Sequence, residues 1–463
     1  METSEVICAV STAPGIGAIA VLRMSGTGCI ALTDRIFESP SGKKLTGAKA
    51  NTVHFGRILE EGCLLDEVLV TIFHAPHSFT GEESVEIACH GSLYIQQRLL
   101  QLLVNQGARL ATPGEFTQRA FLNGKMDLSQ AEAVADLIAS SAASHRMALK
   151  QMKGGFSAEL MKLRGELLHI TSLLELELDF SEEDVEFADR SELRRIAGNI
   201  DELLTRLCRS FSLGNVIKNG VPVAIVGNTN VGKSTLLNAL LREDRAIVSD
   251  IAGTTRDVIE DTINLNGITF RFIDTAGIRA TSDEVENIGI ERTFAKIGQA
   301  SVVLLLTDLN RGVESFEEYY HQVKSRLTSD AKLIIVLNKT DQVEDLLTPQ
   351  ETIRLFTSGE EIIPISARTG ANLDRLIQEL TRTVNLNTLN TSDVIVSNVR
   401  HYEALRNART AIERVNEGLE SGLSGEFISQ DIRECLHYLG EITGEITTDE
   451  VLGNIFKNFC IGK

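Results

Sequence analysis

The spacing of apolar residues changes character along this 463-residue chain. In the first 120 residues, short apolar runs alternate with turn-forming residues, which is typical of β-strands. A longer segment, 92–105, repeats its apolar residues at helical spacing. The pattern predicts strands over Val6–Val10, Ala18–Met24, Val53–Ile58, Glu67–Phe73 and Ser84–Cys89. We therefore expect an N-terminal α+β domain over residues 1–120.

A helical pattern replaces the strands beyond residue 120. A capping box at Ser129–Glu132 opens a region whose apolar residues recur at helical spacings as far as Leu167. Further helices are predicted over 192–211, 401–420, 427–439 and 448–459. We expect residues 121–216 and 384–463 to pack together as one all-α domain, because each flank alone is too short for a good core.

A glycine-rich loop lies between the helical flanks, after the predicted strand Val221–Val226. Gly227 to Ser234 reads G-x-x-x-x-G-K-S and precedes a segment of helical spacing, which is the context of a phosphate-binding loop. Backbone N–H groups of such a loop surround phosphate oxygens, and the helix N-terminus adds partial positive charge. Lys233 would reach the β- and γ-phosphates, and the Ser234 hydroxyl would ligate Mg²⁺.

Later motifs indicate that the nucleotide is GTP. The carboxylate that ends Asn338–Asp341 can accept two hydrogen bonds from guanine, whereas adenine offers the wrong pattern. Ser366–Arg368 can donate a backbone amide to the guanine oxygen, and Asp274–Gly277 would hold Mg²⁺ through water beside the γ-phosphate. Gly253–Asp257 is a switch segment, in which a threonine completes the Mg²⁺ shell. The order of these motifs resembles that of small GTPases, so we expect residues 217–383 to be an inserted Ras-like α/β P-loop GTPase domain.

The residues expected to contact GTP are Asn230, Val231, Gly232, Lys233, Ser234, Thr235, Ser249, Thr254, Thr255, Asp274, Thr275, Ala276, Gly277, Asn338, Lys339, Asp341, Ser366, Ala367 and Arg368. Those expected to hold Mg²⁺ are Ser234 and Thr255.

One position departs from the Ras-like pattern. The residue after the Asp-x-x-Gly motif is Ile278, where Ras-like enzymes have a glutamine that positions the attacking water. An isoleucine side chain cannot hydrogen-bond water, so the positioning group must come from elsewhere. The residues alone leave five acids open, namely Asp257, Asp283, Glu284, Glu286 and Glu291.

Composition narrows the class of protein. A hydrophobic content of 43% and a mean hydropathy of +0.02 are those of a soluble globular chain. No apolar run approaches the ~20 residues of a membrane span, and Met1–Glu5 lacks the basic start of a signal peptide. The seven cysteines are scattered without a C-x-x-C pair, which is expected of cysteines that remain reduced. We therefore expect a cytoplasmic protein that contacts no membrane.

Charge bears on the partners. The net charge is −19 and the pI is about 5.0, whereas backbone-driven binding of nucleic acid needs a basic surface. If the protein serves an RNA, a partner protein should supply much of the positive charge. The segment Glu175–Glu192 carries nine acidic residues and one arginine; it is either a solvated helix end or a docking face for a basic partner.

Taken together, the chain resembles the MnmE (TrmE) family of tRNA modification GTPases over its whole length. The resemblance rests on Phe79–Glu82, Pro113–Ser129 with the following Gln130–Leu137, Gly253–Asp257 and the terminal Phe459–Lys463. It implies a homodimer formed through the N-terminal domain, which would bind 5-formyltetrahydrofolate or a related tetrahydrofolate. It also implies a partner, MnmG, that uses FAD and NADH. The pair would place an aminomethyl or carboxymethylaminomethyl group on carbon 5 of the wobble uridine of certain tRNAs, which the complex would bind, while GTP hydrolysis drives or gates the reaction.

The resemblance also assigns residues. The folate site would involve Arg23, Glu82, Lys125 and Lys463. A carboxylate suits the donor edge of a pterin, and cationic side chains suit the anionic glutamate tail. Cys460 is either a reactive thiol or a small apolar residue beside that site.

For GTP hydrolysis, the resemblance implies that Glu286 is the general base for water. Potassium would compensate charge at the β–γ bridge, held by Asn230 and the carbonyls of Ser249, Ile251 and Thr254. Asn230 alternatively caps the turn, and Arg256 and Arg279 remain candidate arginine fingers. The residues expected to act in catalysis are Glu286, Lys233 and Arg279.

Two other classes of GTPase compete with this interpretation. A ribosome-assembly GTPase would append a basic RNA-binding module, but Gly422–Gly425 is a G-x-x-G in an acidic context without the flanks of a KH fold. A membrane-remodelling GTPase would need a basic amphipathic helix, which the net charge of −19 disfavours.

Overall fold

A computed structural model describes most of the chain, in two compact units that are treated separately below. The described residues are 5–139, 142–179, 190–228, 230–245, 261–266, 268–273, 297–308, 314–328, 331–343, 347–383, 394–457 and 459–462. Unit 1 comprises Met1–Ala139, His145–Thr205 and Glu403–Lys463. Unit 2 comprises Ser140–Ser144 and Arg206–Tyr402.

Unit 1 begins with a seven-stranded sheet in the order β3-β4-β5-β6-β2-β1-β7. All neighbouring pairs in it are antiparallel except β1 and β7, which run parallel. The strands are β1 (Ile7–Val10), β2 (Ile19–Ser25), β3 (Phe37–Glu38), β4 (Thr52–Glu60), β5 (Cys63–Phe73), β6 (Ser84–His90) and β7 (Arg109–Leu110). The predicted strands overlap five of these, whereas the two-residue strands β3 and β7 and the short helix α1 (Cys29–Thr33) were not predicted.

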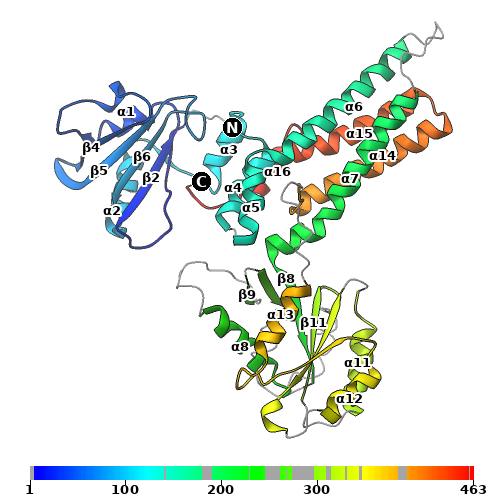
Figure 1. Ribbon diagram of the computed structural model, residues 1–463. Helices are drawn as coiled ribbons and strands as arrows, with labels where there is room; N and C mark the ends of the chain where they lie inside the picture. Colours follow the sequence, from blue (N-terminus) through cyan, green and yellow to red (C-terminus); the bar gives the residue numbers. More distant parts are fainter. Residues whose placement is uncertain are drawn as a thin grey trace. The chain divides into compact units, whose positions relative to one another are not determined.

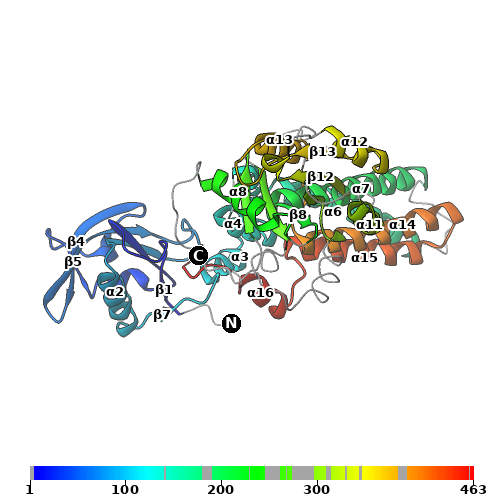
Figure 2. The same cartoon turned by 90° about the horizontal axis from the view of Figure 1, so that it is seen from below.

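The two faces of this sheet have different partners because successive side chains of a strand point to opposite sides. Helix α2 (Leu93–Asn105) covers the face that carries Leu22, Val70 and Ile87, and it contributes Leu99 to the same buried cluster (Figure 1). On the opposite face, helix α3 (Glu115–Leu122) covers the β1 end of the sheet. There Phe116 packs against residues of β1. Figure 2 shows α2 and α3 from below.

The remaining helices of unit 1 come from both ends of the chain. They are α4 (Leu128–Ala139), α6 (Gly155–Asp179), α15 (Gly425–Thr443) and α16 (Asp449–Phe456), together with parts of α5 (Ala142–Met152), α7 (Arg190–Asn219) and α14 (Val399–Ser421). Helices α6 and α15 lie side by side (Figure 1). Arg164 of α6 donates to the Leu436 carbonyl of α15 at 2.9 Å, and Leu174 packs beside Gly425.

One local prediction about this helical region was wrong, and one break in the region was not predicted. The cap of α4 is Asp127 rather than Ser129: Asp127 Oδ1 accepts from the Gln130 N–H at 2.9 Å, and Gln130 Oε1 accepts from the Asp127 N–H at 2.9 Å. This reciprocal pair is a capping box two residues earlier than predicted. The helical region is also interrupted, because Gly154 adopts a φ of 80° between α5 and α6. The apolar spacing continued through the glycines and concealed the break.

Unit 2 is built on a six-stranded sheet in the order β13-β12-β11-β8-β10-β9. All strands are parallel except β9, which pairs antiparallel with β10. The strands are β8 (Val221–Val226), β9 (Asp261–Leu265), β10 (Ile268–Ile273), β11 (Val302–Asp308), β12 (Lys332–Asn338) and β13 (Glu361–Pro364). The helices are α8 (Lys233–Arg245), α11 (Glu314–Lys324), α12 (Leu347–Phe356) and α13 (Leu373–Thr383), with a 3₁₀ turn, η3, over Thr340–Gln342.

Helices cover both faces of this sheet, as near-continuous apolar strands require. One buried cluster joins Val223 of β8 to Leu237 of α8 and Leu376 of α13. The other joins Val226 of β8 to Tyr320 of α11 and to Ile353 of α12. Because the parallel strands end at one edge, the segments that follow β8, β12 and β13 are brought together there.

Within the described residues, none of the helices is long and apolar enough to cross a membrane.

Candidate functional site

The glycine-rich loop of unit 2 is held against its neighbours so closely that two positions require glycine. Gly227 has a φ of 154°, and a Cβ there would lie 2.3 Å from the Leu306 carbonyl oxygen. Gly232 has a φ of 101°, and a Cβ there would lie 2.3 Å from Nδ2 of Asn338. The backbone of the loop therefore lies in direct contact with the ends of β11 and β12. That placement presents the amides of the loop rather than side chains.

Lys233 is the first residue of α8, immediately after this loop. Its ammonium group donates to the carbonyls of Gly227 at 2.6 Å and Asn228 at 3.2 Å, so the side chain folds over its own loop. Burial lowers the pKa of Lys233, since a desolvated ammonium is less stable than one in water. An anion bound in the loop would supply the missing negative charge.

Asn338 connects the phosphate loop to the segments predicted to bind guanine. Its side chain is 2% exposed. Nδ2 donates to the Val231 carbonyl at 2.8 Å, and Oδ1 accepts from the Ala367 N–H at 3.0 Å. One buried side chain thus fixes the loop after β8 to the segment after β13.

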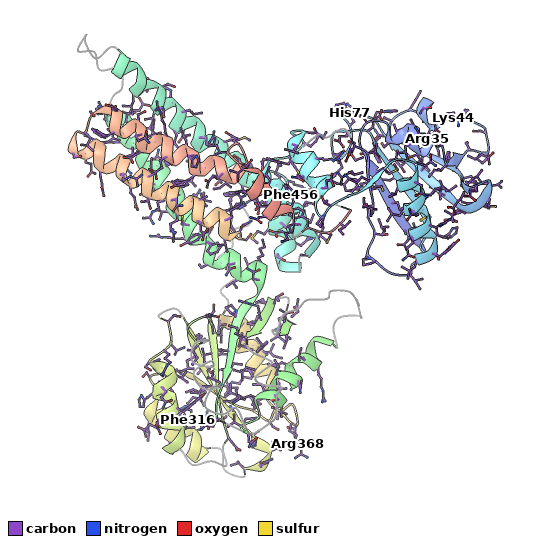
Figure 3. The ribbon with its side chains drawn as sticks, turned by 180° about the vertical axis from the view of Figure 1, so that it is seen from behind. Arg35, Lys44, His77, Phe316, Arg368 and Phe456 are labelled. Carbon is purple, nitrogen blue, oxygen red and sulfur yellow. The ribbon has the colours of Figure 1, made fainter. Side chains whose placement is uncertain are left out.

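Asp341 and Ser366 come together beside this junction. The Ser366 hydroxyl donates to Asp341 Oδ1 at 2.6 Å, which orients the carboxylate predicted to recognise guanine. Lys339 forms an ion pair with Asp308 at 2.6 Å, and the Asp308 side chain is 6% exposed. Asp308 was not singled out from the sequence, although a polar residue that ends a buried strand was a usable signal. Arg368 is exposed on unit 2 (Figure 3).

The structure places only part of the predicted nucleotide site. It brings together Val231, Gly232, Lys233, Asn338, Lys339, Asp341, Ser366 and Ala367. Asn230 is exposed with a φ of 62°, Ser234 follows Lys233 in the first turn of α8, and Thr235 is exposed. Outside the described residues lie Ser249, Ile251, Thr254, Thr255, Asp274, Thr275, Ala276, Gly277, Arg279 and Glu286, as do Ile278, Arg256, Asp257, Asp283, Glu284 and Glu291. Across the described part of the chain, no group of three or more His, Cys, Asp or Glu residues could hold a metal ion.

A second set of predicted residues gathers in unit 1, around the loop from Pro76 to Glu82. Lys125 donates to the Pro76 carbonyl at 2.9 Å, and Asn123 donates to the Thr80 carbonyl at 2.8 Å. Gly81 has a φ of 80°, and a Cβ there would lie 3.2 Å from Asn123 and 3.3 Å from the Lys125 stem. The residues after α3 therefore support this loop from one side.

Arg23 lies on the sheet face that α3 partly covers. It forms a two-pronged ion pair with Glu86 at 3.0 and 2.7 Å. Its guanidinium carbon lies 5.4 Å from the ring centre of Phe79 and 5.9 Å from that of Phe116. Phe79 is 36% exposed, so one aromatic surface remains accessible beside the cation.

Two residues that were not singled out from the sequence, Ser25 and Arg119, form hydrogen bonds with the Glu82 carboxylate. Its Oε2 accepts from the Ser25 hydroxyl at 2.7 Å, and Arg119 of α3 approaches Oε2 at 3.2 Å and Oε1 at 3.4 Å. Arg23, Glu82 and Lys125 thus all border one loop. Lys463, the fourth predicted residue, lies outside the described residues.

The C-terminal segment reaches the same part of unit 1. The Gly114 N–H donates to the Cys460 carbonyl at 3.4 Å, and the Ser11 hydroxyl donates to the Gly462 carbonyl at 3.1 Å. Gly462 has a φ of 93°, and a Cβ there would lie 2.4 Å from the Val10 carbonyl oxygen. Cys460 is exposed. Phe456, at the end of α16, is labelled in Figure 3.

The parallel sheet of unit 2, its phosphate loop and the adjoining Asn338–Asp341 and Ser366–Ala367 segments define a guanine-nucleotide-binding protein of the P-loop class. The chain matches the family model described as "MnmE helical domain" over residues 128–460. It also matches the model described as "GTP-binding protein TrmE N-terminus" over residues 6–125. The chain belongs to the MnmE family.

Two relatives of high identity carry the same name. The tRNA modification GTPase MnmE of Parabacteroides distasonis is 59% identical over 461 residues, covering 99% of each chain. The protein of the same name from Bacteroides fragilis (strain ATCC 25285) is 58% identical over 465 residues, again covering 99% of each. A solved GTP-binding protein from Sulfolobus solfataricus in complex with GDP covers 49% of this chain and 68% of its own, at 19% identity and a TM-score of 0.28.

Proposed function

We propose that this protein is a GTP hydrolase acting in tRNA modification, and that its target is carbon 5 of the wobble uridine in certain tRNAs. The observation that carries the GTP-binding part of the proposal is the junction at Asn338. It joins a phosphate loop to the guanine-binding segments in a chain that belongs to the MnmE family. The similar proteins are named tRNA modification GTPases, which supports the same role for this chain.

For the chemistry of hydrolysis, we infer that Lys233 and the loop amides bind the phosphates. The folded-back Lys233 ammonium, whose hydrogen bonds within the described residues go to two backbone carbonyls, supports this role. The proposal keeps Glu286 as the general base and Arg279 as a further catalytic residue, with Ser234 and Thr255 for Mg²⁺ and with Asn230, Ser249, Ile251 and Thr254 for K⁺. Hydroxyl, amide and carbonyl oxygens are suitable ligands for such hard cations. When bound, the cations stabilise negative charge that develops on phosphate oxygens.

We propose that the Pro76–Glu82 loop is part of a site for 5-formyltetrahydrofolate or a related tetrahydrofolate. Three observations support it. Glu82 is an oriented carboxylate that can accept N–H donors of a pterin. Phe79 offers an accessible aromatic surface for a flat ring, and Arg23 and Lys125 supply cations for an anionic tail. Lys463 completes the proposed set.

The division of the chain into domains is part of the same proposal. Residues 1–120 would form the folate-binding and dimerisation domain, 217–383 a Ras-like GTPase domain, and 121–216 with 384–463 the helical domain. Homodimerisation through the first domain is supported by exposed apolar side chains on the sheet face that α3 leaves open. These are Ile19, Val53, Phe55 and Leu69, with exposures of 67%, 59%, 51% and 48%. MnmG, which uses FAD and NADH, would be the partner, and tRNA would bind to the complex.

Nucleoside analysis tests the proposed target. We would compare wobble nucleosides by mass spectrometry in cells that lack this gene and carry either the wild-type chain or the Lys233→Ala variant. Lys162→Ala, a change of an exposed lysine on α6, is the matched control. We expect C5-substituted uridines with wild type and Lys162→Ala, and their loss with Lys233→Ala or without the gene. Unchanged uridine derivatives in cells without the gene would contradict the proposal and favour a ribosome-assembly GTPase.

A further inference from the structure

Arg119 is a buried arginine of α3 whose contacts include Glu82 of the proposed folate site. Its side chain is 4% exposed. Nη1 donates to the Glu5 carbonyl at 3.0 Å and to Glu82, while Nη2 donates to Glu115 Oε1 at 3.0 Å. A guanidinium withdrawn this far from water is stable only where fixed acceptors surround it. Arg119 therefore has one defined position, set by two carboxylates and a carbonyl.

The contacts of Glu82 are unequal at its two oxygens. Oε2 accepts the short bond from Ser25 at 2.7 Å and the Arg119 contact at 3.2 Å. Oε1 has a longer contact to Arg119, 3.4 Å, in the part of the chain that the structure describes. The Glu82 side chain is 13% exposed. The inner oxygen is thus anchored, and Oε1 retains capacity for a donor that comes from a ligand.

We propose that Arg119 is a positioning residue for ligand recognition in unit 1: it anchors the Glu82 carboxylate so that Oε1 accepts N–H groups of a flat, nitrogen-rich ring. This inference rests on the proposed folate site and deepens it, because it names the residue that orients the recognising group. Arg119 does not contact the ligand in this proposal; it affects ligand binding by orienting the Glu82 carboxylate. Ser25 fixes the same carboxylate, and its hydroxyl is 2.6 Å from that of Thr80.

The planar fork of arginine matters at this position. Glu82 and Glu115 are bound by different nitrogens of one guanidinium, at 3.2 and 3.0 Å. A lysine would keep the charge, but its single ammonium cannot reproduce that rigid two-sided geometry. Arg119→Lys should therefore weaken ligand binding by an intermediate amount, whereas Arg119→Gln should weaken it most.

A double-mutant cycle tests whether Arg119 acts through Glu82. The affinity for 5-formyltetrahydrofolate would be measured by titration calorimetry on the full chain, for wild type, Arg119→Gln, Glu82→Ala and the double variant. We expect Arg119→Gln and Glu82→Ala each to weaken binding by about tenfold or more, because each removes a charge-assisted contact. In the Glu82→Ala background, Arg119→Gln should change the affinity less than twofold. An equal, independent loss in both backgrounds would overturn the proposal.

Two further variants keep the test decisive. Ser25→Ala releases the same carboxylate without removing a buried charge, so it should weaken binding even if Arg119→Gln fails to fold. Arg98→Gln breaks an arginine–glutamate pair at 2.7 Å on α2, on the other face of the sheet, and should leave the affinity unchanged. Normal binding by folded Arg119→Gln or by Ser25→Ala would contradict this inference but not the proposed folate site. If the wild-type chain does not bind 5-formyltetrahydrofolate, the proposed folate site fails with it.

Discussion

Asp341 is the residue proposed to select the base in the nucleotide site. Ser366 orients one of its oxygens at 2.6 Å, and the carboxylate can accept two donors from guanine. An asparagine would present an amide donor instead, which suits the oxygen that xanthine carries at the same edge. We expect Asp341→Asn to weaken GTP binding about a hundredfold or more and to improve xanthosine triphosphate binding. Equilibrium titrations with both nucleotides measure the change, with the exposed Asp374→Asn of α13 as the control. Retained preference for GTP in Asp341→Asn would refute the assignment.

Glu115 gives unit 1 a defined dependence on pH. Burial would raise the pKa of Glu115, but hydrogen bonds from Arg109, the Thr112 N–H and Arg119 outweigh it and lower the pKa to about 2. Its usual value is 4.5. Because the folded-state pKa is depressed, the stabilisation is complete above pH 4.5 and disappears as the pH falls toward 2.

The matching substitution should reveal that window. We expect Glu115→Gln to lower the free energy of unfolding by about 2 kcal/mol at pH 7, with the difference from wild type shrinking between pH 4.5 and 2. Denaturant titrations across pH measure it. Glu67→Gln, which breaks a pair that is about half exposed, should cost less than about 1 kcal/mol. A difference that stays constant with pH would show that the Glu115 charge is not involved.

Helix α3 is the element that connects the ends of unit 1. Its N-terminus begins at Gly114, which faces Phe456 and Phe459 from the C-terminal segment. Arg119 in its middle supports Glu82, and the turn after it supports the Pro76–Glu82 loop through Asn123. A displacement of the C-terminal segment would therefore be transmitted to the proposed folate site through one short helix.

Alanine substitutions at two glycines that flank α3 distinguish the cost of a steric clash from the cost of backbone strain. Gly114 and Gly124 have φ values of 69° and 66°, so alanine is strained to the same extent at both. A Cβ at Gly114 would lie 2.8 Å from the Phe456 carbonyl oxygen, whereas no atom of the described residues lies within 4 Å of a Cβ at Gly124. We expect Gly124→Ala to cost about 1 kcal/mol and Gly114→Ala at least about 1 kcal/mol more in unfolding free energy. Equal costs would mean that the C-terminal segment does not pack there.

Elements with strong local signals were predictable, and those defined by tertiary contacts were not. Strand β8 and the loop after it are specified by an apolar run and fixed glycines, so residues such as Lys233 were found directly. The N-cap of α4 was predicted at the wrong residue because serine and aspartate are both favoured at N-caps, and Ser129 and Asp127 lie two positions apart. Arg119 was missed because its significance comes from burial against Glu82, 37 positions away. No local pattern records a contact of that kind.

At the scale of the whole molecule, the two units carry different proposed ligands. Lys233, Asn338 and Asp341 belong to unit 2, and Arg23, Glu82 and Arg119 belong to unit 1. A ligand that binds only the folded state of one unit stabilises that unit, by about 2.7 kcal/mol at a concentration one hundred times its Kd. The central claim, that one chain binds a guanine nucleotide and a tetrahydrofolate in separate units, therefore predicts two separable stabilisations.

The most direct test is calorimetric unfolding of the full chain with GDP or with 5-formyltetrahydrofolate. The account predicts that each ligand raises the temperature of a different transition. Lys233→Ala should abolish only the GDP effect, and Glu82→Ala only the folate effect. A single transition that both ligands shift, or shifts that survive these substitutions, would contradict the account.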